Sequence, residues 1–152
     1  MDESPLHRSL ADLKPGDHLC FFYASESEHR AVLTLFLQHG LERGEKIIYL
    51  TDHHVPDLIL SYLEAAGVKP DPYLASGQLR VVELEEVLAD LPVPGPEGLL
   101  PLLAQEAGQA QAEGFAGLRF TYEMTWAIKN LLGADRLSDY GGKLGEFSRG
   151  SA

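Results

Sequence analysis

Three short apolar runs of this sequence carry, or are followed by, side chains that could do chemistry. The first run, 18–23, holds His18 and Cys20 on one face of a predicted strand and ends at Tyr23. An imidazole and a thiol on one face could line a small-molecule pocket or bind a metal as a pair. Alternatively, Cys20 is a small core residue and His18 bonds a backbone carbonyl, and residue chemistry alone favours this second interpretation.

The second run, 46–50, is followed by Asp52, His53 and His54. These side chains could supply general acid–base groups or metal ligands. The plainer alternative, which we prefer from the residues alone, is that Asp52 caps the next helix and both histidines are solvated.

Glu123, Met124 and Trp126 follow the run 117–122. Together they suit an apolar pocket with one polar anchor, although a single tryptophan suits a packed core equally well. The sequence contains no nucleophile elbow, no Ser/His/Asp order and no carboxylate pair at a readable spacing. We therefore expect that the protein is not an enzyme.

Alternating strands and helices must position these side chains. Strands are expected at 18–23, 46–50, 78–84 and 117–122, and helices at 25–43, 56–66, 99–113 and 134–147. This alternation predicts an α/β fold with a mostly parallel sheet and crossover helices on both faces, hence three layers. Ligands of such sheets bind at the carboxyl ends of the strands, where the groups described above would gather.

The first long helix has the clearest signals. Ser25 and Glu28 have the spacing of a capping box, and Gly44 is placed to end the helix. His29 and His39 lie on this helix, and we expect them to be hydrogen-bonded histidines at the edge of the core.

The turn that precedes this helix, 23–28, has no glycine and no lysine. Neither G-x-x-x-x-G-K-[ST] nor G-x-G-x-x-G occurs anywhere in the chain, and two glutamates in the turn would repel a triphosphate. ATP hydrolysis of the P-loop kind is therefore excluded, and no cofactor is expected.

Composition narrows the remaining classes of protein. A chain of 152 residues predicts one domain over 1–152, with 1–12 as a flexible N-terminal segment. A net charge of −11 with only 12 Lys and Arg disfavours direct nucleic-acid binding. One cysteine excludes an internal disulfide, and no apolar run approaches the roughly 20 residues that span a bilayer. We expect a cytoplasmic protein that does not enter a membrane.

The order of three motifs resembles the MEDS family, the methanogen/methylotroph DcmR-type sensory domain, from about Leu13 to Phe147. The motifs are as follows: H-x-C-x-x-Y at His18, Cys20 and Tyr23; G-L-x-x-G-E-K at Gly40, Leu41, Gly44, Glu45 and Lys46; and Arg…Glu-Met-x-Trp at Arg119, Glu123, Met124 and Trp126. This resemblance implies a RecA/KaiC-like frame without a Walker A loop. It also implies a sensor of small hydrocarbon derivatives in signalling and transcription regulation.

The resemblance changes the ranking of the candidate residues. It makes His18, Cys20 and Tyr23 the leading sensor-site residues, within a ligand-binding set completed by Asp52, Arg119, Glu123, Met124 and Trp126. We expect a small-molecule ligand and a partner regulator. The C-terminal stretch 139–152 departs from the family, and a missing last strand there would leave an open sheet edge suited to a homodimer. The alternatives are an interaction module with a collapsed pocket, or a metal or nucleotide site that uses His18, Cys20 and the Asp52–His54 cluster.

Overall fold

The computed structural model describes residues 5–14, 21, 23–52, 54–92 and 98–123. Its helices are α1 (Pro5–Ala11), α2 (Glu26–Glu42), α3 (Pro56–Ala65), α4 (Asp71–Ser76), α5 (Leu84–Ala89) and α6 (Leu99–Ala112). Its strands are β1 (Lys46–Thr51), β2 (Leu79–Glu83) and β3 (Leu118–Tyr122). Within these residues no helix is both long enough and apolar enough to cross a membrane.

The three strands form one parallel sheet in the order β2-β1-β3. Ile47 pairs with Leu79 on one side and with Arg119 on the other, so β1 is the central strand. Parallel neighbours require crossover connections, which the helices supply. The predicted α/β class and parallel sheet are confirmed, whereas the RecA/KaiC-like arrangement stays a prediction.

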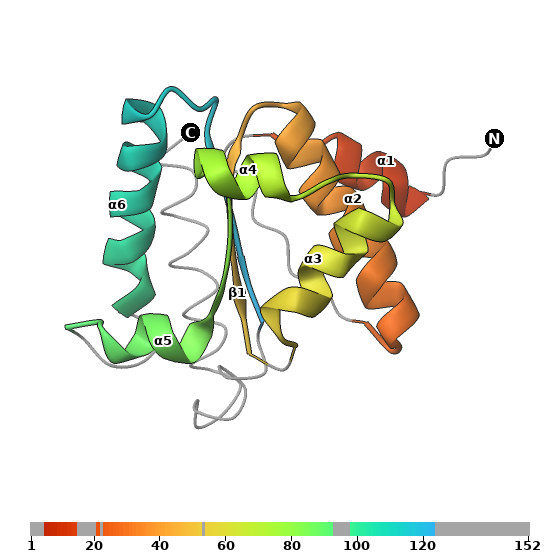
Figure 1. Cartoon of the computed structure of the whole chain (residues 1–152), viewed down its shortest axis with the longest axis horizontal. Coiled ribbons are helices and arrows are strands. Elements are labelled where there is room, and N and C mark those ends of the chain that lie inside the picture. Colours follow the sequence, from red (N-terminus) through yellow and green to blue (C-terminus); the bar gives the residue numbers. More distant parts are fainter. Residues whose placement is uncertain (1–4, 15–20, 22, 53, 93–97, 124–152) are drawn as a thin grey trace.

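Alternate residues of β1 enter two separate hydrophobic clusters. Ile47 and Tyr49 pack with residues of α1, α2 and α3, whereas Ile48 and Leu50 pack with residues of α5 and α6. Figure 1 shows the corresponding arrangement, with α1 to α3 on one side of the sheet and α5 and α6 on the other. Burial on both faces explains why the strand reads as a continuous apolar run instead of an alternating one.

Helix α2 begins as its sequence predicts. The Ser25 hydroxyl accepts a hydrogen bond from the Glu28 amide, and the Glu28 carboxylate accepts one from the Ala24 amide. Gly40 allows the helix to approach the sheet closely. A Cβ added at this position would lie 2.8 Å from Ile47 Cδ1 and 2.9 Å from Arg119 Cδ.

Several short elements were not predicted. Helices α4 and α5 each have six residues, too few for a readable apolar period. We expected residues 1–12 to be flexible, but α1 lies within that segment and its Leu10 is fully buried in the core. Of the predicted strand 18–23, the structure describes only Phe21 and Tyr23, which lie in no helix or strand. The predicted helix 134–147 falls outside the described residues.

Candidate functional site

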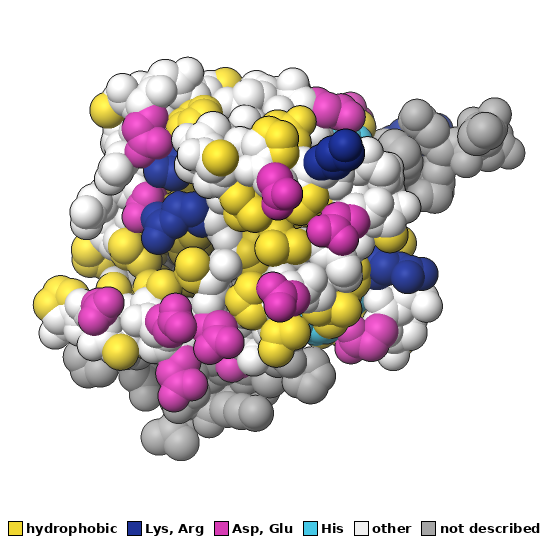
Figure 2. All heavy atoms as spheres, in the orientation of Figure 1, with side chains coloured by type: hydrophobic (Ala, Val, Ile, Leu, Met, Phe, Trp, Pro, Cys, Tyr) yellow, Lys and Arg dark blue, Asp and Glu magenta, His cyan; other side chains and the backbone are white. Residues whose placement is uncertain are grey.

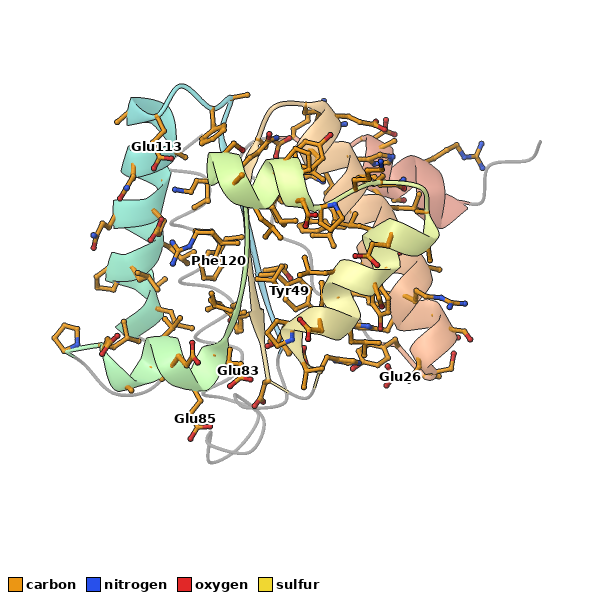
Figure 3. The ribbon with its side chains drawn as sticks, in the orientation of Figure 1. Glu26, Tyr49, Glu83, Glu85, Glu113 and Phe120 are labelled. Atoms are coloured by element: carbon orange, nitrogen blue, oxygen red, sulfur yellow. The ribbon has the colours of Figure 1, made fainter. Side chains whose placement is uncertain are left out.

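Three segments that are distant in the sequence meet at the carboxyl end of the sheet. His54 follows β1, Glu123 follows β3, and Glu26 and His29 lie in the first turn of α2. The Glu123 amide donates to the Leu50 carbonyl, which extends the β1–β3 ladder by one bond and fixes the start of the chain after β3. Figure 3 shows Glu26 at the beginning of α2 and Tyr49 on the side of the sheet that faces α2 and α3.

The His54 side chain links all three segments. Its Nδ1 lies 3.0 Å from Glu123 Oε2 and its Nε2 lies 2.7 Å from Glu26 Oε2. The His54 amide also donates to the Glu123 carboxylate. The side chains of His54 and Glu123 are only 3% and 6% exposed, whereas that of Glu26 is 63% exposed. The site therefore has a buried inner part and an outer wall that solvent reaches.

The protonation of His54 follows from these partners. Burial lowers the His54 pKa, but hydrogen bonds and charge from Glu123 and Glu26 outweigh burial, so the pKa is raised above its usual value. Carboxylates accept hydrogen bonds and do not donate them, so the two contacts are satisfied together when both ring nitrogens carry protons. An imidazolium between two carboxylates is the state that this geometry favours.

His29 is parallel to His54 and is held by two tyrosines. The ring centroids are 4.1 Å apart and the planes are parallel. His29 Nδ1 lies 3.1 Å from the Tyr62 hydroxyl, and its Nε2 lies 3.2 Å from the Tyr49 hydroxyl. A hydroxyl can donate or accept, so these partners suit a neutral ring in either tautomer.

Tyrosine side chains surround the two rings. The Tyr23 ring lies 4.7 Å from the His29 ring and 6.3 Å from the His54 ring, with 37% of Tyr23 exposed. Burial, followed by the negative charge of nearby carboxylates, raises the pKa of Tyr23, Tyr49 and Tyr62. All three hydroxyls are therefore protonated at neutral pH and can act as hydrogen-bond donors.

The site also gathers side chains of the types that bind metal ions. One ligand atom each from Glu26, His29 and His54 lies within 4.8 Å of the other two. Figure 2 shows further acidic side chains gathered around α5 at the same end of the molecule. The exposed acidic residues in α5 and at its two ends are Glu83, Glu85, Glu86 and Asp90. Their charge favours the approach of cations to this end of the sheet.

Some of the predicted site residues lie at the His54 site and others do not. Tyr23 and Glu123 both lie at this site. Asp52 is exposed and does not cap α3, whose N-cap residue Val55 has no side-chain hydrogen bond. The preferred expectation of a solvated His54 is also wrong, because His54 is 6% exposed. Five other candidates lie outside the described residues, namely His18, Cys20, His53, Met124 and Trp126.

Arg119 lies elsewhere, in the amino-terminal half of β3. Its guanidinium makes two bonds to the Glu45 carboxylate, at 3.0 and 3.2 Å, and donates to the Phe36 carbonyl at 2.8 Å. Glu123 lies four positions further along the chain, or about 13 Å away at the usual rise of a strand. The predicted ligand-binding role of Arg119 stays a prediction, because its observed contacts join α2 to the sheet.

Five residues of the site did not enter the predicted ligand-binding set: Glu26, His29, Tyr49, His54 and Tyr62. His54 entered only the alternative metal or nucleotide site, as part of the Asp52–His54 cluster. A signal for His29 exists in the sequence. It lies three and four residues before the buried Val32 and Leu33, so the apolar stripe of α2 continues through it. A histidine on the buried face of a first helical turn lies next to the strand ends. The two tyrosines carry no such signal, because each also reads as an ordinary core residue.

A family model matches residues 17–151 of the chain, and its description is "MEDS: MEthanogen/methylotroph, DcmR Sensory domain". The match covers most of the chain and includes every residue of the site described above. Among curated proteins, no relative matches the chain.

Proposed function

Because the chain belongs to the MEDS family of sensory domains, we propose that it is a non-enzymatic sensor whose small-molecule ligand binds at the His54 site. The ligand is a small hydrocarbon derivative that carries one polar group, such as an alkylamine or an alcohol. The signal passes to a partner regulatory protein. Family membership supports the sensory role, and the geometry of the site supports the location and the chemistry of binding.

One observation carries the location. A single buried imidazole holds the end of β1, the start of α2 and the residue after β3 together through two carboxylates. A ligand that replaces either carboxylate contact must change how these three segments are joined. Such a change is the local event that a sensory domain needs, because a ligand shifts a conformational equilibrium only through its different affinity for the two states.

The side chains also indicate the ligand. Tyrosine and imidazole rings offer apolar faces, while Glu26 and the tyrosine hydroxyls offer polar contacts. A small ligand with an alkyl part and an amine or hydroxyl group matches both kinds of surface. An alkylammonium ion would also interact favourably with the tyrosine faces and the exposed carboxylate of Glu26.

The same contacts support a non-enzymatic role. His54 contacts one carboxylate through each ring nitrogen, and these carboxylates raise its pKa and favour its charged form. A histidine that already holds both protons is a poor general base near neutral pH. A structural and ligand-responsive role suits this residue better than proton abstraction.

Direct titration tests the proposal. Trp126 is the only tryptophan in the chain and lies three residues after Glu123 in the sequence, so its emission reports on this segment. We expect a saturable change in emission with millimolar methylamines or C1–C2 alcohols, accompanied by a higher melting temperature, because a ligand that binds the folded state stabilises it. Halocarbons of the same size serve as ligands without a hydrogen-bonding group.

A matched pair of variants locates the binding. Tyr62→Phe removes a hydroxyl from the site, whereas Tyr73→Phe removes one from α4, where Tyr73 packs at the edge of the core. The first change is expected to weaken ligand binding about fivefold to tenfold, the effect of one lost hydrogen bond, and the second to leave it unchanged. Equal effects from both variants, or no response to any compound, would contradict the proposal.

A further inference from the structure

We propose that Glu26, His29 and His54 form a binding site for one divalent transition-metal ion of the zinc type. The proposal does not require the sensory role, because it rests on the arrangement of these three side chains. Their candidate ligand atoms already lie within 4.8 Å of one another, and they come from two elements, the first turn of α2 and the turn after β1.

The ligand types select the metal. Two imidazole nitrogens and one carboxylate oxygen suit Zn²⁺ and its neighbours, whereas Mg²⁺ and Ca²⁺ prefer sets made only of oxygen. Three protein ligands also leave a fourth position of the tetrahedron open. An open position is the feature that separates sites that bind exogenous ligands from closed structural zinc sites.

The partners of the two histidines are those of metal-binding imidazoles. A ligating histidine usually donates its second ring N–H to a carboxylate or another oxygen, which fixes the ring and the tautomer. Glu123 occupies that place for His54, at 3.0 Å from Nδ1, and leaves Nε2 directed toward Glu26. Tyr62 occupies the same place for His29, at 3.1 Å from Nδ1.

Metal binding requires two local movements. Ligand atoms around a tetrahedral zinc are about 3.4 Å apart, so Glu26 Oε2 must withdraw from His54 Nε2, which now lies 2.7 Å away. The Glu26 side chain is 63% exposed, so it can turn toward solvent. One imidazole must also turn, because lone pairs of parallel rings cannot meet at one ion. We assign that turn to His29, which exchanges its contact with the Tyr49 hydroxyl for the metal.

The metal would replace the proton on His54 Nε2, which faces the Glu26 carboxylate. Binding through Nε2 requires that this nitrogen lose its proton, so one proton is released to solvent as the metal–nitrogen bond forms. The cation then balances the charge of Glu26 and of the buried Glu123. No oxidation or reduction takes part in this exchange.

Zinc titration of the full chain, freed of metal by a chelator, tests the site. We expect one Zn²⁺ per chain in competition with a chromophoric chelator, and no competition from Mg²⁺. His29→Gln and Glu26→Gln should weaken zinc binding by at least tenfold, and Glu123→Gln by about tenfold because it acts through His54. His39→Gln is the matched control, since His39 lies on the same helix near its other end. It should bind zinc as the unchanged protein does.

Co²⁺ provides a second readout that does not depend on affinity. The loaded protein should show the visible absorption of a four- or five-coordinate nitrogen and oxygen site, and His29→Gln should abolish it. Glu26 is an exposed side chain, so Glu26→Gln keeps the test valid if His29→Gln fails to fold. Zinc affinity that is unchanged in both variants, or a thiolate-to-cobalt charge-transfer band from Cys20, would overturn the proposed ligand set.

Discussion

The two ends of the sheet both bury charged side chains, but they use different cations. At the amino end, Arg119 is paired with Glu45, and the buried Lys46 lies 2.9 Å from Glu113. At the carboxyl end, the corresponding place between carboxylates is taken by the imidazole of His54. Guanidinium and ammonium groups keep their charge at any physiological pH, whereas an imidazole can lose its proton or bind a metal.

This difference separates a structural region from a candidate functional one. The Arg119 guanidinium lies 4.7 Å from the centre of the Phe36 ring and donates to the Phe36 carbonyl. It therefore joins α2 to β3 at any physiological pH. The contacts of His54 hold the opposite end of the same helix, but they depend on a proton that a ligand or metal can replace. We infer that the amino end provides stability and the carboxyl end provides response. The predictions below test this division.

The largest expected effect on stability belongs to the amino end. Arg119→Met leaves the Glu45 carboxylate without its bidentate partner and should lower the free energy of unfolding by about 3 kcal/mol, as for other broken buried pairs. Arg119→Lys should lose less, because it keeps the charge but not the fork geometry. Urea denaturation measures both. Zinc affinity of the folded variants should not change, and a parallel loss of zinc binding would contradict the division.

A smaller loss of stability is expected when His54 is replaced at the carboxyl end, together with a loss of zinc binding. His54→Leu removes the partner of the buried Glu123 and should cost about 2 kcal/mol. Adding Glu123→Gln should recover part of this loss, because no buried carboxylate is then left without its imidazole. Denaturation of both single variants and the double variant measures the coupling. Additive losses would show that the two side chains do not interact as the structure indicates.

Two glycines offer a matched comparison of packing. Gly40→Ala places a methyl group against Ile47 and Arg119. It should destabilise the protein by about 1 kcal/mol, because the cost of overpacking exceeds the gain in helix propensity. Gly108→Ala on α6 meets nothing within 4 Å and should stabilise by about 0.5–1 kcal/mol. Thermal melts of the two variants should shift in opposite directions. A higher melting temperature for both variants would show that α2 does not approach the sheet as closely as described.

The smallest expected effect concerns pH and the exposed carboxylate of Glu113. Its hydrogen bond with Lys46 lowers the Glu113 pKa below 4.5. A lowered folded-state pKa stabilises the protein above the unfolded value and ceases to do so as pH falls through the folded value. Glu113→Gln should therefore lower the melting temperature slightly at pH 7, and the difference should shrink below pH 4.5. Glu64→Gln, an exposed change on α3, is the control and should show no such trend.

Local patterns predicted most of the regular elements. The capping pair Ser25 and Glu28, the apolar period of α2 and the buried run of β1 each depend on neighbouring residues only, and each is confirmed. Helices α4 and α5 have too few residues to show a period. The sequence also placed Glu123 correctly at a strand end, because the end of a buried run is itself a local feature.

The partners of those residues required the tertiary structure. The contact of His54 with Glu123 spans 69 residues and that with Glu26 spans 28 residues. Nothing in a local pattern states which strand lies beside which, and only the order β2-β1-β3 brings the ends of β1 and β3 together. Arg119 and Glu123 belong to one sequence motif but lie at opposite ends of β3, because an extended strand carries residues four positions apart about 13 Å from each other.

The sequence by itself determined that neither G-x-x-x-x-G-K-[ST] nor G-x-G-x-x-G occurs, that the chain forms a parallel α/β sheet, and that polar groups follow its strands. Composition, periodicity and turn chemistry are sufficient for such conclusions because they act over a few residues. The tertiary structure decided which of these groups form one site. The burial of His29 and His54 against each other, with one carboxylate from α2 and one from the chain after β3, depends on how helices and strands pack, and packing is a property of the whole fold.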